Sequence, residues 1–322
     1  MAENQPILQV EHLKTWFPVG HKAMLHAVDD VSFTMQPGET LGLVGESGCG
    51  KTTLGRTLLK LYQPNEGRIL FRGEDITHVS TKEQRALYGK MQMIYQDPYA
   101  SLNPFMTIGE IVSEGLIIQK DPRAKDRSER DEIMFRMLER VGLNREHANR
   151  FPHEFSGGQR QRAGIARALA VNPEFVVCDE AVSALDVSVQ AQIINLLMDL
   201  RDELGLTYLF IAHDLSVVRC ISSRVAVMYM GRIVEIAETR ELFEHPANPY
   251  TIGLLNAVPE ADPAYEKAKT YSVMNGEIKT PVDPKPGCRF ADRCPRATDR
   301  CRREDPQLRE IAPDHQCACF NL

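Results

Sequence analysis

A glycine-rich loop constrains the fold of this chain more than any other part of its sequence. Residues 45–52 read Gly-Glu-Ser-Gly-Cys-Gly-Lys-Thr, which has the spacing G-x-x-x-x-G-K-[ST] of loops that bind phosphate groups. The apolar run Thr40–Val44 before the loop predicts a strand, and a helix is predicted to begin near Thr53. A strand, a glycine loop and a helix in this order indicate an α/β fold with a nucleotide site at the loop.

The residue types in the loop suit a triphosphate. Its glycines let the backbone approach phosphate oxygens without a Cβ in the way, and the helix N-terminus adds a partial positive charge. We expect Lys51 to reach the β- and γ-phosphates and the Thr52 hydroxyl to bind Mg²⁺, whereas Cys49 is interpreted as a small loop residue and not a nucleophile. The predicted nucleotide-binding segment is Gly45, Glu46, Ser47, Gly48, Cys49, Gly50, Lys51, Thr52 and Thr53.

A second feature completes such a site. The apolar run Phe175–Cys178 predicts a buried strand, and Asp179 and Glu180 follow it directly. Carboxyl ends of parallel strands face the ligand crevice of an α/β fold. Adjacent acidic residues at a strand end are commonly a solvated turn, but beside a phosphate loop they predict chemistry. We expect Asp179 to hold Mg²⁺ and Glu180 to polarise the water that attacks the γ-phosphate.

Strands and helices alternate over the first 240 residues, with a helical region inserted between them. Further strands are predicted from apolar runs, and residues from about 97 to 170 read as mostly helical. After Glu244 many prolines interrupt regular structure, so we expect a catalytic domain at 1–244 and a small appended module at 245–322. The other predicted strands are Ile7–Leu13, Arg68–Phe71, Met91–Tyr95, Tyr208–Ala212 and Val225–Met230.

Length and charge limit the class of protein. A chain of 322 residues suits about two domains, and its net charge of −6 argues against a protein that mainly neutralises nucleic-acid phosphates. The start of the chain does not resemble a signal peptide, and no run of apolar residues is long enough for a membrane span. We therefore expect a soluble protein of the cytosol.

Cysteines divide the chain unevenly. Of the eight cysteines, five fall in the last 35 residues, and in a reducing compartment such a cluster suits a metal better than disulfides. Four thiolates match either an iron–sulfur cluster or tetrahedral zinc, and unmetallated thiols are the remaining alternative. The same region holds arginines that could face a partner subunit, although a solvated surface is the simpler interpretation: Arg289, Arg293, Arg296, Arg300, Arg302 and Arg303.

A short motif before the acidic pair connects the chain to a known family. Ser156-Gly157-Gly158-Gln159 resembles the signature of the ATP-binding subunits of ABC transporters, and a serine and glycine amides at a helix start can bind phosphate oxygens. The resemblance covers residues 7–240. It implies a mixed sheet of the P-loop ATPase type, an antiparallel β subdomain and an inserted helical subdomain. It also implies that this signature contacts ATP held by a second subunit.

Other positions match the family pattern one by one. Gln96 resembles the glutamine that touches Mg²⁺ and water, and His213 the switch histidine that contacts the γ-phosphate. Phe17 falls where relatives stack an aromatic ring on adenine, with Trp16 as the neighbouring alternative. The loop Ser183–Asp186 resembles the segment where two subunits meet. Ala181 is a departure, because many relatives have proline there.

The tail narrows the resemblance to importers of dipeptides and oligopeptides, and within them to the second ATP-binding subunit of dipeptide importers. The matching segments are His245–Thr251, Leu254–Leu255, Val258–Pro259 and Gly287–Cys319. The resemblance implies a [4Fe–4S] cluster, with Cys319 preferred over Cys317 as the fourth ligand. The expected ligands are Cys288, Cys294, Cys301 and Cys319.

The sequence thus predicts an ATP-hydrolysing subunit of a peptide importer that uses ATP and Mg²⁺. Its expected partners are a paralogous ATP-binding subunit, two membrane-spanning permease subunits and an extracytoplasmic peptide-binding protein, with no nucleic acid. The expected location is the cytoplasmic face of the bacterial plasma membrane. Two alternatives stay open: an importer of nickel or another small solute, and a soluble ABC-type ATPase that acts on nucleic acid or ribosomes.

Overall fold

The computed structural model describes residues 5–257 and 279–322 and divides the chain into two compact units. Within the described residues, the first unit comprises the chain up to Met35, Thr40–Thr77 and everything from Ala212 onward. The second unit comprises Gln36–Glu39 and His78–Ile211. The phosphate loop lies in the first unit and the acidic pair lies in the second.

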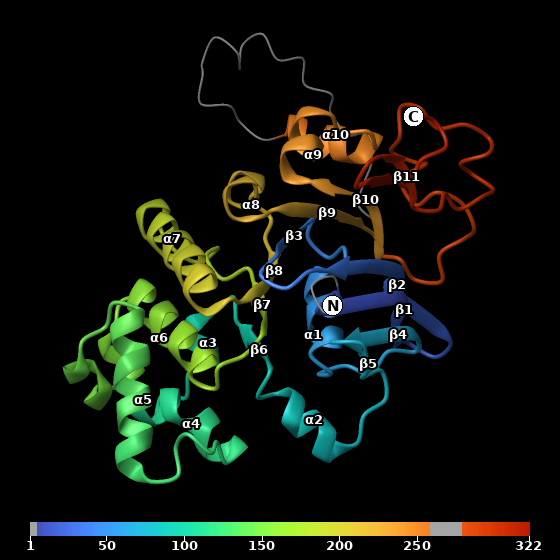
Figure 1. The fold of residues 1–322 in the computed structure, drawn as a ribbon. Helices are drawn as coiled ribbons and strands as arrows, with labels where there is room; N and C mark the ends of the chain where they lie inside the picture. Colours follow the sequence, from blue (N-terminus) through green and yellow to red (C-terminus); the bar gives the residue numbers. More distant parts are fainter. Residues whose placement is uncertain (1–4, 258–278) are drawn as a thin grey trace, which may run out of the picture. The chain divides into compact units, whose positions relative to one another are not determined.

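The first unit contains an antiparallel sheet of four strands. Its strand order is β2-β1-β4-β5, and β1 and β2 form a long hairpin in which Leu8 faces Met35 and Val19 faces Ala23. The inward positions Leu8, Val10 and Leu13 are buried, as alternation along a half-buried strand requires. The strands are β1 (Leu8–Val19), β2 (Ala23–Met35), β4 (Glu66–Phe71) and β5 (Glu74–Asp75), and α1 (Lys51–Leu58) accompanies them (Figure 1).

The first unit also holds part of a second sheet, in the order β11-β12-β10-β9-β3. All five residues of β3 are buried, and β3 pairs in parallel with β9. The β9–β10 turn uses Met230 and Gly231, both at positive φ, as a two-residue hairpin requires. The strands are β3 (Thr40–Val44), β9 (Arg224–Tyr229), β10 (Arg232–Glu238), β11 (Arg309–Ala312) and β12 (His315–Cys317).

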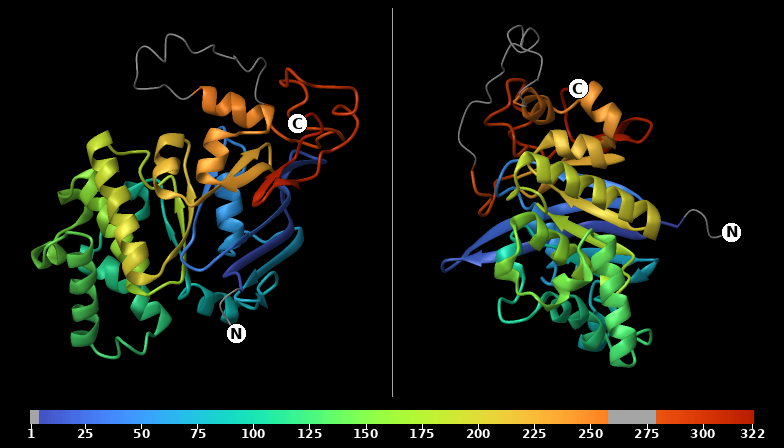
Figure 2. Two further views of the ribbon diagram at one scale, coloured as in Figure 1. Left: turned by 45° about the horizontal axis from the view of Figure 1, so that its top comes forward. Right: turned by 90° about the vertical axis from the view of Figure 1, so that its left-hand side faces the viewer.

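The C-terminal tail is built into this sheet. β12 pairs with β10, so that Cys317 lies opposite Glu235, and β11 continues the sheet outward. Figures 1 and 2 show residues 279–322 (red) running beside β10 and α10 in every view. Backbone hydrogen bonds therefore join the tail to the sheet of the first unit. The helices of this region are α8 (Leu215–Ile221), α9 (Thr239–Glu244) and α10 (Pro249–Asn256).

The second unit combines a parallel three-stranded segment with packed helices. Strands β8, β7 and β6 lie in that order, and each pair is parallel. Residues 97–170, all of them described, contain α3 to α6 and no strand. The elements are β6 (Met91–Ile94), β7 (Phe175–Asp179), β8 (Thr207–Ile211), α2 (Thr81–Leu87), α3 (Pro98–Ser101), α4 (Ile108–Gln119), α5 (Arg127–Arg140), the 3₁₀ turns Arg145–Asn149 and Pro152–Glu154, α6 (Gly157–Ala170) and α7 (Val187–Leu204).

The predicted α/β fold with a mixed sheet and an antiparallel sheet is confirmed. The first helix begins at Lys51, slightly earlier than expected. The domain boundary at residue 244 stays a prediction, since the two compact units divide the chain elsewhere. No helix in the described part of the chain is long and apolar enough to cross a membrane.

Candidate active site

Two glycines of the phosphate loop are required by close backbone contacts. A Cβ on Gly45 would lie 2.1 Å from the Met228 carbonyl oxygen, and one on Gly50 would lie 2.0 Å from that of Ala27. Both glycines also have positive φ, 151° and 109°, which side chains disfavour. The loop therefore fits against β2 and β9 only with glycine at these positions.

The Lys51 side chain is buried within the phosphate loop. Its Nζ donates hydrogen bonds to the Gly45 carbonyl at 2.7 Å and the Glu46 carbonyl at 3.1 Å, and the residue is only 5% exposed. Cys49 Sγ lies 3.7 Å from the same ammonium. Burial raises the pKa of the Cys49 thiol, so the thiol stays protonated, which supports its interpretation as a loop residue. Thr52 follows at half-buried depth at the start of α1.

The two aromatic candidates for adenine stacking have different surroundings. Trp16 stacks on His26 with ring centroids 4.2 Å apart, and its indole nitrogen donates to Asp29 at 3.1 Å. Phe17 meets Tyr62 edge-on at 5.2 Å. One face of Trp16 is therefore already covered, which favours Phe17 for stacking. The sequence did not single out Tyr62, which follows α1 and is an aromatic neighbour of this position.

The acidic pair and the predicted glutamine are assembled within the second unit. Asp179 ends β7 and is 3% exposed. Glu180 has φ of 47°, an uncommon conformation for a side-chain-bearing residue and one found at functional sites. Its backbone nitrogen donates to Ile211 at 2.9 Å. Gln96 Nε2 donates to Glu180 Oε2 at 2.7 Å, so the structure joins two side chains that are 84 residues apart.

Hydrogen bonds hold the turn after Glu180. The Ser183 backbone nitrogen and hydroxyl donate to the Glu180 carbonyl at 3.1 and 3.0 Å. Gln190 Nε2 donates to the Val182 carbonyl at 2.9 Å. Ala181 itself is 1% exposed. These hydrogen bonds fix the turn with alanine at position 181.

The signature motif starts α6. Ser156 is exposed, its hydroxyl accepts a hydrogen bond from the Gln159 backbone nitrogen at 3.3 Å, and its own nitrogen donates to Gln159 Oε1 at 3.0 Å. A Cβ on Gly158 would lie 2.6 Å from Val189 Cγ1, so α6 and α7 pack closely only because Gly158 has no side chain. Gly157 remains partly exposed at the helix start. An exposed capped helix start suits contact with phosphate from outside the chain.

Two further predicted residues lie at helix starts. Asp186 caps α7 by accepting from the Val189 nitrogen at 3.0 Å, and Val187 next to it is 81% exposed. His213 belongs to the first unit, is exposed and precedes α8, which Asp214 caps. These positions place an exposed apolar side chain and an imidazole on the surfaces of their respective units.

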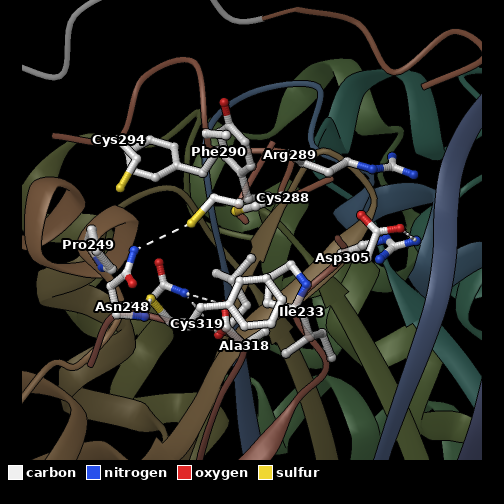
Figure 3. Close-up of a pocket in the computed structure, with 18 residues that line it drawn as sticks. Ile233, Asn248, Pro249, Cys288, Arg289, Phe290, Cys294, Asp305, Ala318 and Cys319 are labelled. Carbon is white, nitrogen blue, oxygen red and sulfur yellow. Dashed lines mark hydrogen bonds and ion pairs between the residues drawn. The ribbon is translucent and has the colours of Figure 1, made fainter. Parts of the chain in front are cut away.

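The four predicted cysteine ligands line one pocket in the tail. Figure 3 shows Cys288, Cys294 and Cys319 around it, and Cys301 is also part of its wall. Cys317 does not line this pocket; it lies in β12, where burial raises its thiol pKa. Cys319 therefore shares a pocket with the other three predicted ligands, whereas Cys317 does not.

Hydrogen-bond donors surround two of these sulfurs. Cys301 Sγ contacts Thr298 Oγ1 at 3.3 Å and Asn321 Nδ2 at 3.4 Å, and Cys319 Sγ accepts from the Asn321 nitrogen at 3.3 Å. Burial opposes ionisation of Cys301, but these hydrogen bonds outweigh it and lower its pKa. Burial raises the pKa of Cys288 to about 11. Within residues 5–257 and 279–322, no three His, Cys, Asp or Glu side chains are grouped to hold a metal ion.

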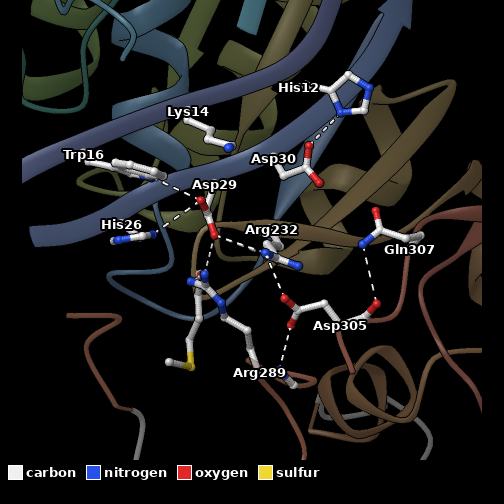
Figure 4. Close-up of polar contacts among 12 residues, drawn as sticks. His12, Lys14, Trp16, His26, Asp29, Asp30, Arg232, Arg289, Asp305 and Gln307 are labelled. Carbon is white, nitrogen blue, oxygen red and sulfur yellow. Dashed lines mark hydrogen bonds and ion pairs between the residues drawn. The ribbon is translucent and has the colours of Figure 1, made fainter. Parts of the chain in front are cut away.

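The arginine-rich tail is not simply a solvated surface. Arg289 and Arg293 have side chains only 7% exposed, and both pair with acids of the ATPase core. Arg289 pairs with Asp29, and Arg232 approaches the same carboxylate at 3.2 Å (Figure 4). The interpretation as a solvated surface was therefore wrong for these two tail arginines, because their charges are neutralised inside the first unit.

The phosphate loop, the acidic pair and the helix-capping signature define a P-loop ATPase of the ABC class. The family model described as ABC transporter matches residues 28–183, and the model described as oligopeptide/dipeptide transporter, C-terminal region, matches residues 234–301. The chain belongs to the ATP-binding subunits of oligopeptide and dipeptide ABC transporters. It is an ATP-hydrolysing subunit of a peptide importer.

Individual relatives agree with this assignment. The chain is 52% identical to the putative oligopeptide transport ATP-binding protein YkfD of Bacillus subtilis, over 98% of this chain and 95% of that protein. It is 53% identical to the oligopeptide transport ATP-binding protein OppF of the same organism, over 88% and 95%. Among solved structures, the dimeric post-hydrolysis state of the cassette MJ0796 with ADP and Pi is 28% identical, with a TM-score of 0.66, over 72% of this chain and 99% of that one.

Proposed function

We propose that this subunit hydrolyses ATP as one half of a two-subunit sandwich. The observation that carries the proposal is the exposed, capped start of α6 at Ser156, with Gly157 partly exposed beside it. The chain has one phosphate loop and one signature, so a complete pair of sites needs a second subunit. We infer a paralogous ATPase as that partner. The MJ0796 cassette is dimeric in its post-hydrolysis state, which supports pairing of such cassettes.

Catalysis in this proposal rests on positioning and charge. The Lys51 ammonium, which lies among loop carbonyls, binds the β- and γ-phosphate oxygens. Thr52 and Asp179 would hold the Mg²⁺ that neutralises charge on the phosphates. Glu180 accepts a proton from the attacking water, and the hydrogen bond from Gln96 orients its carboxylate. No covalent intermediate with the protein is required.

Three further roles complete the proposed site. His213 contacts the γ-phosphate and responds to its loss, and Phe17 stacks on adenine. Ser156, Gly157, Gly158 and Gln159 bind the ATP of the partner subunit, so that binding closes the pair and hydrolysis opens it.

The cycle of closure and opening drives transport through other chains. We infer two membrane-spanning permease subunits and an extracytoplasmic peptide-binding protein, and a peripheral location on the cytoplasmic face of the bacterial plasma membrane. The catalytic domain is assigned to 1–244 and the importer-specific extension to 245–322. The name oligopeptide transport ATP-binding protein, which relatives carry at about half identity, supports this assembly.

The tail is proposed to hold a [4Fe–4S] cluster through Cys288, Cys294, Cys301 and Cys319. Four thiols that line one pocket fit such a group, and donors next to Cys301 and Cys319 are the kind of contact that tunes cluster sulfurs. When bound, the cluster would tie the tail together.

Two experiments test these proposals. Co-purification from detergent-solubilised membranes with ATP trapped should recover a paralogous ATPase and permease subunits. Recovery of nucleic acid or ribosomes in their place would reject the transport assembly. Chain purified under strict anaerobiosis should be coloured and contain about four irons per chain. A colourless, iron-free preparation would reject the cluster without affecting the ATPase assignment.

A further inference from the structure

The tail reaches the phosphate loop through a buried ion pair. Arg293 donates from its two terminal nitrogens to the two carboxylate oxygens of Glu46, at 2.7 and 2.9 Å. Glu46 is the second residue of the phosphate loop, and its side chain is only 17% exposed. Two parallel hydrogen bonds between a guanidinium and a carboxylate add geometric specificity to the charge attraction of the pair. This pair therefore fixes the position of Glu46 as well as neutralising its charge.

A second contact fixes the backbone of the same residue. The Glu46 nitrogen donates to the Tyr250 hydroxyl at 2.9 Å. Tyr250 lies on α10, is fully buried, and packs against Tyr229 and Phe290 with ring centroids 4.5 and 5.4 Å away. Phe290 belongs to the same tail segment as Arg293. Side chain and backbone of Glu46 are thus both held by residues that follow the ATPase motifs in the sequence.

The backbone carbonyl of Glu46 accepts a hydrogen bond from Lys51. Because Lys51 Nζ bonds to the carbonyls of Gly45 and Glu46, the position of Glu46 sets the position of the ammonium. A glycine-rich loop loses more conformational entropy on ordering than other backbone does. When contacts outside the loop supply that order in advance, the ligand that binds there loses less affinity to ordering.

We propose that Arg293 and Tyr250 are positioning residues for nucleotide binding, and that the C-terminal tail pre-orders the phosphate loop through Glu46. This role goes beyond the proposed transport assembly and requires neither a metal in the tail nor a partner subunit. The role acts on affinity for ATP, because both residues contact the phosphate loop and neither carries a proton in hydrolysis.

The test is the dissociation constant of a non-hydrolysable ATP analogue for the isolated full-length chain. Arg293→Met and Glu46→Gln should each weaken binding about tenfold, as expected for loss of a charged hydrogen-bonded contact. The double variant should bind no more weakly than either single one. Arg293→Lys should recover part of the affinity, since it keeps the charge and loses the paired geometry. Arg303→Met, which removes an exposed arginine of the same tail, is the matched control and should bind like the parent chain.

A second variant separates positioning from folding. Tyr250→Phe keeps the buried ring and removes the acceptor of the Glu46 nitrogen, so it should weaken binding about threefold while the thermal unfolding temperature stays close to that of the parent. Unchanged affinity in folded Arg293→Met chain would overturn the proposal. So would additive losses in the double variant, since independent effects mean that the ion pair does not act on the loop. These outcomes are independent of co-purification and of iron content.

Discussion

Replacement of Asp29 by asparagine gives the sharpest test of how the tail is joined to the ATPase core. Asp29 is 5% exposed, accepts from Trp16 Nε1 at 3.1 Å, and pairs with Arg289 and Arg232. Asparagine keeps nearly the same volume and can still accept from Trp16. The change therefore removes one negative charge and leaves the Arg289 guanidinium buried without its ion-pair partner.

The size of the effect follows from burial. Loss of one partner from a buried ion pair typically costs about 3–5 kcal/mol, because the remaining charge stays desolvated. Arg232 is 21% exposed and can regain water, so we expect the lower end, about 3 kcal/mol. Asp30→Asn is the matched control: its partner His12 is 78% exposed, and such surface pairs contribute less than about 1 kcal/mol.

The assay uses a reporter that the chain already contains. Trp16 is the only tryptophan in the sequence, and its indole nitrogen bonds to the substituted residue. Urea unfolding followed by Trp16 fluorescence should show a lower midpoint for Asp29→Asn and an almost unchanged one for Asp30→Asn. Equal free energies of unfolding for the two variants would refute the reasoning, because the buried ion pair would then stabilise the fold no more than the exposed one.

The same pair predicts a dependence on pH. Burial alone would raise the pKa of Asp29, but the charges of Arg289 and Arg232 outweigh it and lower the pKa. A carboxyl with a lowered folded pKa stabilises the fold above its unfolded pKa of about 3.9, and it loses that contribution as pH falls through the folded value. The difference between parent chain and Asp29→Asn should be full at pH 7 and shrink progressively below about pH 5. A difference that is constant from pH 7 to pH 3 would contradict this.

Three more variants test separate parts of the structure. Glu180→Gln should lower ATP turnover by about 100-fold or more while ATP still binds, measured by phosphate release and equilibrium binding; near-normal turnover would remove Glu180 from the mechanism. Gly158→Ala should lower the free energy of unfolding by about 1–3 kcal/mol because its methyl group meets Val189, and an unchanged denaturation midpoint would contradict the close helix packing. Cys319→Ser should lose iron in anaerobic preparations and Cys317→Ser should keep it, measured by metal analysis; the reverse result would move the fourth ligand.

Buried parallel strands were the most predictable elements. β3 matches its predicted range, and β7 and β8 differ from theirs by one residue at their ends, because strands covered on both faces read as continuous apolar runs. β2 was not predicted. Its sequence includes Asp29 and Asp30, and buried Asp29 is neutralised by Arg232 of β10 and by Arg289 of the tail. Local pattern does not contain that information.

In the candidate site too, local sequence motifs were predictable and contacts between distant residues were not. Motif spacing located Lys51, Asp179 and Glu180, because each motif is a short local segment. The sequence did not reveal that Arg293 supports the loop, since the pair with Glu46 joins residues 247 positions apart. The run of tail arginines was the only signal, and it did not distinguish the two buried side chains from the exposed ones.

The contact between Arg293 and Glu46 has a practical consequence for how such chains are shortened. A fragment that ends at residue 244 keeps every ATPase motif but lacks both Tyr250 and Arg293, so Glu46 would be left as a bare carboxylate beside the incoming triphosphate. Nucleotide affinities measured on such a fragment would understate those of the intact subunit. In this protein the smallest complete nucleotide-binding unit therefore extends at least to Arg293.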